Sequence, residues 1–272
     1  MSRLRGVDFK TGKAFFRTEF YSVSIYRISF WLRFVYTFLM MYSMGYVWKA
    51  LYQANPNALS VSLPEMITYA VLGIALEAIL HPYHGPKTYI MEQVRKGTIE
   101  MDLMKPMDFQ FYMFAKNMGG IFVKLLCQVF PPLVIAYFFF GFTVPHITQV
   151  LAFFVSLILG ILVSFLLNFI LGLLSMVIMN IQNINWGYNA TLRFFSGQMV
   201  PLALFPGFIG VLSAILPFRC IYSIPISIYI GSSKGTEMFA ALGLQAGWVF
   251  VLFIASRLMM RHVFRRLMIQ GG

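Results

Sequence analysis

The chain has 272 residues, of which 59% are hydrophobic and 11% charged, and its formal net charge is +12. It contains six apolar stretches close to the roughly 20 residues that a membrane-spanning helix needs, which excludes an ordinary soluble domain. The positive charge does not indicate nucleic acid binding, because the basic residues gather at the termini and in one loop, without base-stacking aromatic side chains among them.

We therefore predict an all-α polytopic membrane protein, a single domain over residues 1–272 with six transmembrane helices. Its first element is an amphipathic helix over residues 8–27, in which Phe9, Phe16 and Phe20 share one face. Such a helix lies in the membrane interface with its basic face toward the headgroups. The alternative is a cytoplasmic helix that packs on the protein's own loops. Basic residues precede any long apolar run, so we expect no cleavable signal peptide.

The predicted spans follow in order over residues 28–50, 65–82, 117–140, 149–179, a stretch that starts near 187, and 238–258. Ser62 and Glu65 before the second span are spaced as in a capping box, with Pro64 in the first turn. The pair Pro131-Pro132 lies inside the third span and predicts a kink there.

The fifth span loses its helical pattern in its later half. Glycine and proline residues interrupt residues 198–230 and leave two short apolar stretches, 198–215 and 217–230. Neither is long enough for a comfortable crossing. We predict that both are short re-entrant helices that enter the outer leaflet and return, which requires protein or water to cover their backbone.

The orientation follows from the basic residues. Of the 21 Lys and Arg residues, 15 lie in the N-terminal segment, in the polar loop 83–116 between the second and third spans, or in the C-terminal tail. Cytoplasmic loops are enriched in these residues. We therefore predict a multi-pass protein with both termini and the loop 83–116 in the cytoplasm.

Four ionisable residues lie within predicted spans, in the cytoplasmic half of the membrane: Arg33, Glu77, Lys124 and Arg193. A charged group at the bilayer centre costs about 2.5–3.5 kcal/mol unless it is paired or hydrated. One interpretation is a positively lined inner vestibule open to the cytoplasm, with Glu77 paired to Lys124 or Arg33. The other is that Arg33 and Arg193 reach the lipid headgroups, and for these two residues it is the favoured one.

Enzyme motifs give little support to a catalytic function. His81 and His84 have an H-x-x-H spacing, but Pro82 lies between them and further ligands are needed, so we predict no metal site. The sequence contains no G-x-x-x-x-G-K-[ST] loop, and we predict that the chain does not hydrolyse ATP by itself.

Four features resemble a known family, and the first is the amphipathic helix before the first span. The stretch from Arg95 to Pro106, R-K-G-T-I-E-M-D-L-M-K-P, is similar to the signature R-x-G-x-[IL]-[DE]-x-x-L-x-[KR]-P of the permease subunits of ABC type-2 exporters. The break at Ser196-Gly197 and Phe205-Pro206, followed by Leu216-Pro217-Phe218, resembles the outer region of the same subunits. The resemblance extends over nearly the whole chain.

The resemblance implies a coupling helix in the loop 83–116 that docks in a groove of a separate ATP-binding subunit. The expected ATPase-coupling residues are Glu92, Val94, Arg95, Lys96, Gly97, Glu100, Leu103, Lys105 and Pro106. Apolar anchors at Ile90, Val94, Ile99 and Leu103 would hold the helix at the membrane, while charged residues, Asp102 included, would face the partner. The alternative is an ordinary solvated loop.

The resemblance also implies an outer gate formed by Gly197, Pro201, Phe205, Pro206 and Pro217. It implies a second permease chain, identical or homologous, and a location in the bacterial inner membrane. The chain itself is expected to hold no cofactor, because the partner subunit binds ATP and Mg²⁺. The implied function is ATP-driven export of a hydrophobic or amphiphilic substrate such as a drug, a peptide or a lipid-like molecule. The alternatives are an ATP-independent channel or ion-coupled carrier, and a membrane anchor for an ATPase.

Overall fold

The computed structural model of the chain describes residues 27–54, 61–80, 85–143, 145–178, 182–198, 200–202, 205 and 207–270. These residues form helices and turns, and none of them lies in a β-strand. The predicted interface helix over residues 8–27 lies outside the described residues except for its last one.

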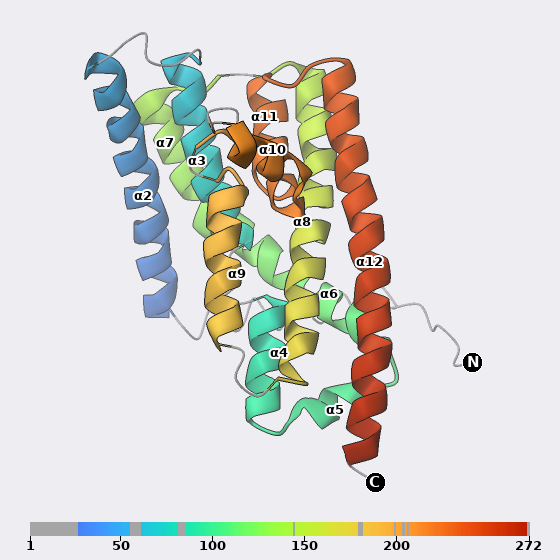
Figure 1. Ribbon diagram of the computed structural model, residues 1–272. Helices are drawn as coiled ribbons and strands as arrows, with labels where there is room; N and C mark the ends of the chain where they lie inside the picture. Colours follow the sequence, from blue (N-terminus) through green and yellow to red (C-terminus); the bar gives the residue numbers. More distant parts are fainter. Residues whose placement is uncertain are drawn as a thin grey trace.

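The helices run alongside one another as a bundle (Figure 1). In chain order their bounds are α2 (Arg27–Ala54), α3 (Leu63–Leu80), α4 (Pro86–Arg95), α5 (Ile99–Leu103), α6 (Phe109–Lys124), the π-helical η2 (Leu125–Val129), α7 (Phe130–Phe140), α8 (Ile147–Ser175), α9 (Gln182–Phe195), α10 (Gly207–Ile215), the 3₁₀ turn η4 (Pro217–Cys220), α11 (Ser223–Ile230) and α12 (Thr236–Gln270).

Four helical segments in the described part of the chain are long and apolar enough to cross a membrane: Leu63–Leu80, Phe109–Phe140, Ile147–Ser175 and Thr236–Arg265. They match the second, third, fourth and sixth predicted spans. The first and fifth predicted spans are helical, but their helices do not meet this standard. The helix α2 has 28 residues but includes Arg33 and Lys49, and α9 has only 14 residues and a polar first turn.

The third span is one continuous helical path through α6, η2 and α7. It begins at Phe109, eight residues before the predicted start of the span, because Asp108 caps α6 and accepts a hydrogen bond of 2.9 Å from the backbone N–H of Phe111. A π-helical segment ends at Val129, and Phe130 separates it from Pro131 and Pro132. The regular α-helical hydrogen bonding is thus interrupted before the proline pair, since proline cannot donate the helical hydrogen bond, and the kink itself stays a prediction.

The helix α8 lies at the centre of the bundle and packs against α4, α11 and α12. Its buried residues include Val163, Phe169 and Leu173. Small residues let neighbours approach closely: a Cβ added at Gly172 would lie 2.7 Å from the side chain of Ile90 in α4. The outward faces of the helices are apolar instead, with Phe138 80% exposed and Phe250 66% exposed, as expected for surfaces that face lipid.

The region after α9 contains the two short helices that the sequence predicts, α10 with nine residues and α11 with eight. The turn before α11 lies against the middle of α8, because a Cβ at Gly160 would be 2.9 Å from the carbonyl oxygen of Cys220. The end of α11 lies near the start of α8, where Gly231 contacts Gln149. Between Gln149 and Gly160, α8 is about 16 Å long at 1.5 Å per residue. The chain therefore meets α8 at Cys220, about 16 Å from the Gly231–Gln149 contact, and α11 runs back antiparallel to α8.

The side chain of Gln245 in α12 forms hydrogen bonds to the inserted segment, residues 217–230. Its Nε2 donates to the carbonyl oxygens of Cys220, at 2.8 Å, and of Ser156 in α8, at 3.1 Å. The hydroxyl of Ser156 donates back to the Oε1 of Gln245 at 2.8 Å. Backbone that is not helical at this depth needs such partners, because lipid offers none.

Candidate functional site

The polar loop between the second and third predicted spans forms a helical hairpin of α4 and α5 that projects from the bundle at the end where α12 finishes (Figure 1). Gly97 makes the turn, with a φ of 69°. The N–H groups of Thr98 and Gly97 bond the carbonyls of Gln93 and Val94 at 2.9 and 3.1 Å. This is the pattern of a Schellman cap, which requires a left-handed residue and therefore favours glycine.

The predicted apolar anchors of the hairpin face the protein. Ile90 and Ile99 are buried, and Val94 and Leu103 are half-buried against the core. The charged residues Glu92, Arg95, Lys96 and Glu100 are exposed, as is Pro106. Glu92 and Lys96 pair at 2.6 Å across one helical turn, and this hydrogen bond lowers the pKa of Glu92.

One prediction for the hairpin is wrong: Asp102 does not face solvent. It is 7% exposed, because its carboxylate accepts from the Tyr89 hydroxyl at 2.8 Å and from the Lys105 ammonium at 2.6 Å. Lys105 also donates to the Tyr112 hydroxyl at 2.8 Å. Burial acts to lower the pKa of Lys105, but these two partners outweigh burial and raise it. The group ties α5 to α4 and α6.

Sequence reasoning missed the most exposed apolar side chains of the hairpin. Met101 is 70% exposed and Met104 is 83% exposed, both at the α5 end. Charged residues surround them in the sequence. The signal that could have identified them is their place in the period of α5: they lie on the face opposite Ile99, which is buried.

The residues predicted for an inner vestibule lie on different helices around the lower half of the bundle. Glu77 of α3 pairs with Arg193 of α9 at 3.8 Å. From the sequence, Glu77 was predicted to pair with Lys124 or Arg33, and Arg193 to contact the lipid headgroups. Lys124 of α6 donates to the carbonyl oxygen of Ile79 at 3.5 Å. Arg33 lies on an exposed part of α2.

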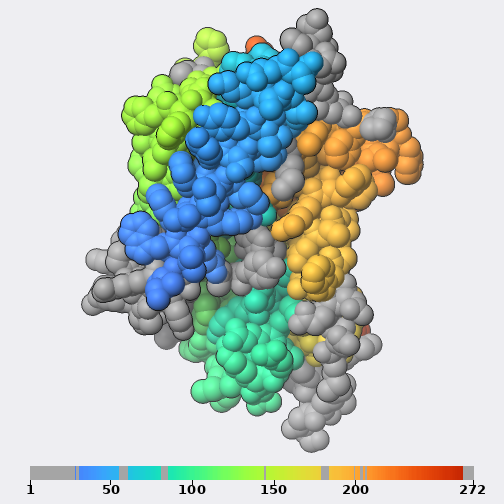
Figure 2. Space-filling view, turned by 90° about the vertical axis from the view of Figure 1, so that its left-hand side faces the viewer, coloured from blue at the N-terminus to red at the C-terminus, as the bar shows by residue number. Residues whose placement is uncertain are grey.

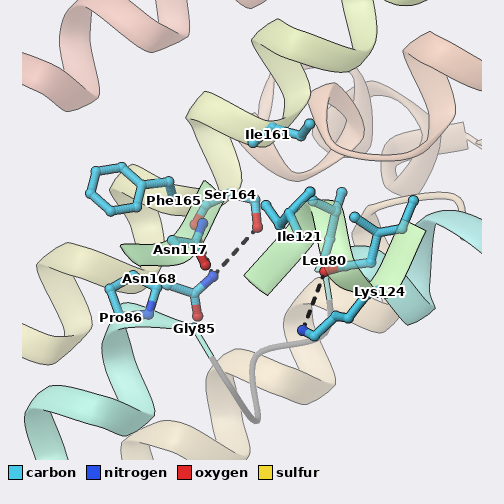
Figure 3. A pocket seen from close by; sticks show the side chains of 11 residues that line it. Leu80, Gly85, Pro86, Asn117, Ile121, Lys124, Ile161, Ser164, Phe165 and Asn168 are labelled. Atoms are coloured by element: carbon cyan, nitrogen blue, oxygen red, sulfur yellow. Dashed lines mark hydrogen bonds between the residues drawn. The ribbon is translucent and has the colours of Figure 1, made fainter. Parts of the chain in front are cut away.

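A cavity of about 10 Å³, room for about one water molecule, adjoins Lys124. Figure 3 shows Asn117 of α6 and Ser164 and Asn168 of α8 around it. The Oδ1 of Asn168 is buried and has no hydrogen-bond partner among the described residues. The structure therefore places polar groups and a cation together at this level, in a space too small for a drug-sized molecule.

The predicted outer gate is attached to one face of α3. Tyr69, Gly73 and Glu77 recur every four residues and therefore line one side of that helix. The Tyr69 hydroxyl donates to the carbonyl oxygen of Gly197, whose φ is 68°. Gly73 leaves room for the carbonyl of Gln198, which a Cβ would strike. Together with the Glu77–Arg193 pair, these contacts hold the end of α9 against α3.

The other predicted gate residues lie near this break. The ring of Phe205 lies 5.3 Å from that of Phe194 in α9, centroid to centroid. Pro201 is half-buried, and Pro217 is buried as the first residue of η4. Pro206 lies outside the described residues. The backbone N–H of Ser223 in α11 bonds the carbonyl oxygen of Ser196 at 3.1 Å, so the break and the inserted segment are joined directly.

The described residues contain no group of three or more His, Cys, Asp or Glu that could bind a metal ion. His81 and His84, the pair weighed from the sequence, lie outside the described residues.

Comparison with known proteins identifies the family. No sequence among curated proteins matches the chain. The sequence pattern of a family described as ABC-2 family transporter protein matches residues 24–271, from just before α2 to the end of α12. The match extends over nearly the whole chain, including the hairpin and the inserted segment, and the chain therefore belongs to the ABC-2 family of transporter membrane proteins.

Proposed function

We propose that this protein is the membrane subunit of an ATP-driven exporter, and that it works with separate ATP-binding subunits on the cytoplasmic side. The observation that carries the proposal is the α4–α5 hairpin. It projects from an otherwise membrane-embedded bundle, and it exposes Met101 and Met104 on and after α5, in a hairpin whose charged residues Arg95, Lys96 and Glu100 are also exposed. Large apolar side chains that are exposed in a charged surround are typical of a protein-binding surface.

The proposed topology has six spans and both termini in the cytoplasm. The four long apolar helices are joined by α2 and by α9 with its break, and α10 and α11 form the outer re-entrant region. The cytoplasmic assignment of the hairpin end is supported by the basic residues at the same end of α12, Arg257, Arg261 and Arg265. Arg257 also pairs with Asp108, the cap of α6.

A second permease chain would complete the transport pathway. The helices α2 and α9 lie on the same face of the molecule, above the hairpin (Figure 2). Both expose aromatic side chains on their surfaces, with Trp31 60% exposed and Trp186 76% exposed. A pathway between two such faces would be mainly apolar, which suits a hydrophobic or amphiphilic substrate. The Glu77–Arg193 pair would lie at its inner part and the Gly197 break at its outer part.

The mechanism we propose is a movement of the bundle that follows ATP-driven closure of the partner subunits. The partner pushes on the hairpin, and the hairpin moves as one body because its anchors are buried and its turn is capped. Helices connected to the hairpin then change their angle, and the outer break opens or closes.

Docking is tested by replacing the two exposed methionines. Burying a methionine side chain stabilises a complex by about 1.5–3 kcal/mol, so Met101→Asp/Met104→Asp should weaken binding of the ATP-binding subunit by roughly a hundredfold or more. The matched control is Met101→Leu/Met104→Leu, which keeps the apolar surface and should bind normally. The measurement is co-purification and titration of the two subunits in lipid nanodiscs.

Two results would contradict the proposal. Equal binding by the Asp and Leu variants would exclude the exposed methionines of the hairpin as the docking surface. Movement of a fluorescent amphiphile across vesicles by the purified chain alone, without nucleotide or partner, would favour an ATP-independent channel or carrier.

A further inference from the structure

The side chain of Lys87, in the first turn of α4, is buried although it carries a charge. It is 2% exposed, and burial lowers its pKa to about 8. None of the ion pairs among the described residues includes it. The start of a helix is also the end at which the backbone dipole disfavours a cation. A lysine is rarely held in such a place without a specific contact.

The contact that Lys87 makes is with α9. Its Nζ donates to the Oδ1 of Asn189 at 3.2 Å and lies 4.8 Å from the centre of the Tyr188 ring. A cation over an aromatic face contributes about 0.5–2 kcal/mol, more when water is excluded. The ammonium therefore connects the hairpin to α9 through two adjacent residues.

The backbone at Lys87 packs against α8. A Cβ added at Gly172 of α8 would lie 3.3 Å from the Cα of Lys87, and the neighbouring Ile90 fills the same contact. The helix α4 thus packs closely on α8, and a long buried side chain extends from it to α9. Movement of α4 along α8 would carry the ammonium, and with it Asn189.

The other end of α9 is held at the outer break. Arg193 pairs with Glu77, and the carbonyl of Gly197 accepts from Tyr69. Asn189 lies about 9 Å along the helix from Phe195, where α9 ends, and Gly197 follows in the break. A displacement of α9 at Asn189 is therefore passed to the break through less than two turns of helix.

We propose that Lys87 is the positioning residue that couples the α4–α5 hairpin to α9, through its hydrogen bond to Asn189 and its contact with Tyr188. The inference rests on the proposed function, because it names the connection through which a push on the hairpin reaches the outer break. The connection is a two-residue contact between elements that are far apart in sequence.

The test follows the movement of α9 and needs no knowledge of the cargo. A bimane label is attached to Trp186→Cys, an exposed position of α9, in a chain with Cys127→Ser; Cys220 is fully buried and is kept. The complex with its ATP-binding subunit is placed in lipid nanodiscs. Bimane emission is recorded on addition of Mg-ATP, together with the ATPase rate and the melting temperature.

Lys87→Met keeps the stem and removes the charge and the hydrogen bond. We expect it to reduce the ATP-dependent bimane change by about tenfold, within the usual range for coupling between sites, with ATPase rate and melting temperature close to wild type. Asn189→Ala should give the same loss, and the double variant should lose no more than either single one. Lys87→Arg keeps the donor and should retain most of the change.

The matched control is Lys234→Met, which removes an exposed lysine in the turn between α11 and α12, away from the hairpin and from α9, and should leave the bimane change intact. A full bimane change in Lys87→Met would overturn the inference. So would a loss that parallels losses of ATPase rate and melting temperature, since Lys87 would then only stabilise the fold. Absence of any ATP-dependent change in the wild-type complex would contradict the proposed function itself, and the inference with it.

Discussion

Glycine replacements provide the sharpest test of how the inserted segment packs. A Cβ added at Gly160 would lie 2.9 Å from the carbonyl oxygen of Cys220 and 3.3 Å from that of Ile221. At Gly73 the added Cβ would overlap the carbonyl oxygen of Gln198 more severely. At Gly247 of α12 it would meet no atom within 4 Å. The neighbours at the first two sites are backbone atoms, which cannot rotate away.

The magnitudes follow from two opposing effects. Forcing an extra methyl group into a packed contact costs about 1–3 kcal/mol, whereas alanine is favoured over glycine in a helix by about 1 kcal/mol. For Gly160→Ala the net loss should be about 0–2 kcal/mol, because a shift of a few tenths of an ångström relieves the contact. For Gly73→Ala the loss of unfolding free energy should be at or above the upper end of this range. Gly247→Ala should be neutral or stabilising by up to about 1 kcal/mol.

The assay is thermal unfolding of the three variants in the same detergent, followed by tryptophan fluorescence. About 2–4 °C per kcal/mol is expected for a chain of this size. The predicted order of melting temperatures is Gly247→Ala at or above wild type, then Gly160→Ala, then Gly73→Ala. A melting temperature of Gly73→Ala equal to or above that of wild type would refute the close contact between α3 and the break after α9.

Three further predictions concern polar contacts. Burial lowers the pKa of Lys87 to about 8 from its ordinary 10.5, so between these pH values the unfolded chain binds more protons than the folded one and stability should rise with pH. The melting temperature of the wild type should therefore rise from about pH 7.5 to 10.5, and that of Lys87→Met should lack this rise. Equal pH dependence in the two proteins would contradict the prediction. Asp102→Asn should lower the free energy of unfolding by about 1 kcal/mol, a modest loss because Lys105 is 38% exposed and solvent screens its pair with Asp102. Amide hydrogen exchange over residues 96–106 should become faster, and unchanged exchange would exclude a stabilising role for Asp102. Gln245→Leu should lower the free energy of unfolding by about 1–2 kcal/mol and increase maleimide labelling of Cys220. If Cys220 stays protected from maleimide in this variant, other contacts hold the inserted segment.

Much of the architecture could be predicted because it follows from local patterns. The apolar stretches predict the long helices, since hydrocarbon requires every backbone group to be paired within the helix. The prolines and glycines after residue 196 predict two short helices, which the structure contains as α10 and α11. The Ser62–Glu65 spacing is a capping signal, and the Glu65 carboxylate accepts from the N–H of Ser62 at 3.0 Å.

The candidate site was predicted only in part, because pairing between helices depends on their rotation and depth. The sequence located Glu77 and Arg193 in the inner half, but four ionisable residues can be paired in several ways, and only the packed bundle joins these two. Asp102 resembles the other charges of its stretch, yet Tyr89 and Lys105 bury it. Met101 and Met104 are ordinary apolar residues by composition, and their exposure appears only once α5 is seated on Ile99.

What the sequence determined by itself is therefore that this is a helical multi-pass membrane protein, where its four long apolar helices lie along the chain, and where its basic residues gather. These depend on residue type and on spacing within a few turns. Which helix face meets which was decided by the tertiary structure alone. Lys87 reaches Asn189 across 102 residues of chain, and Gly73 admits the carbonyl of Gln198, because close packing selects contacts by shape, which no local pattern encodes.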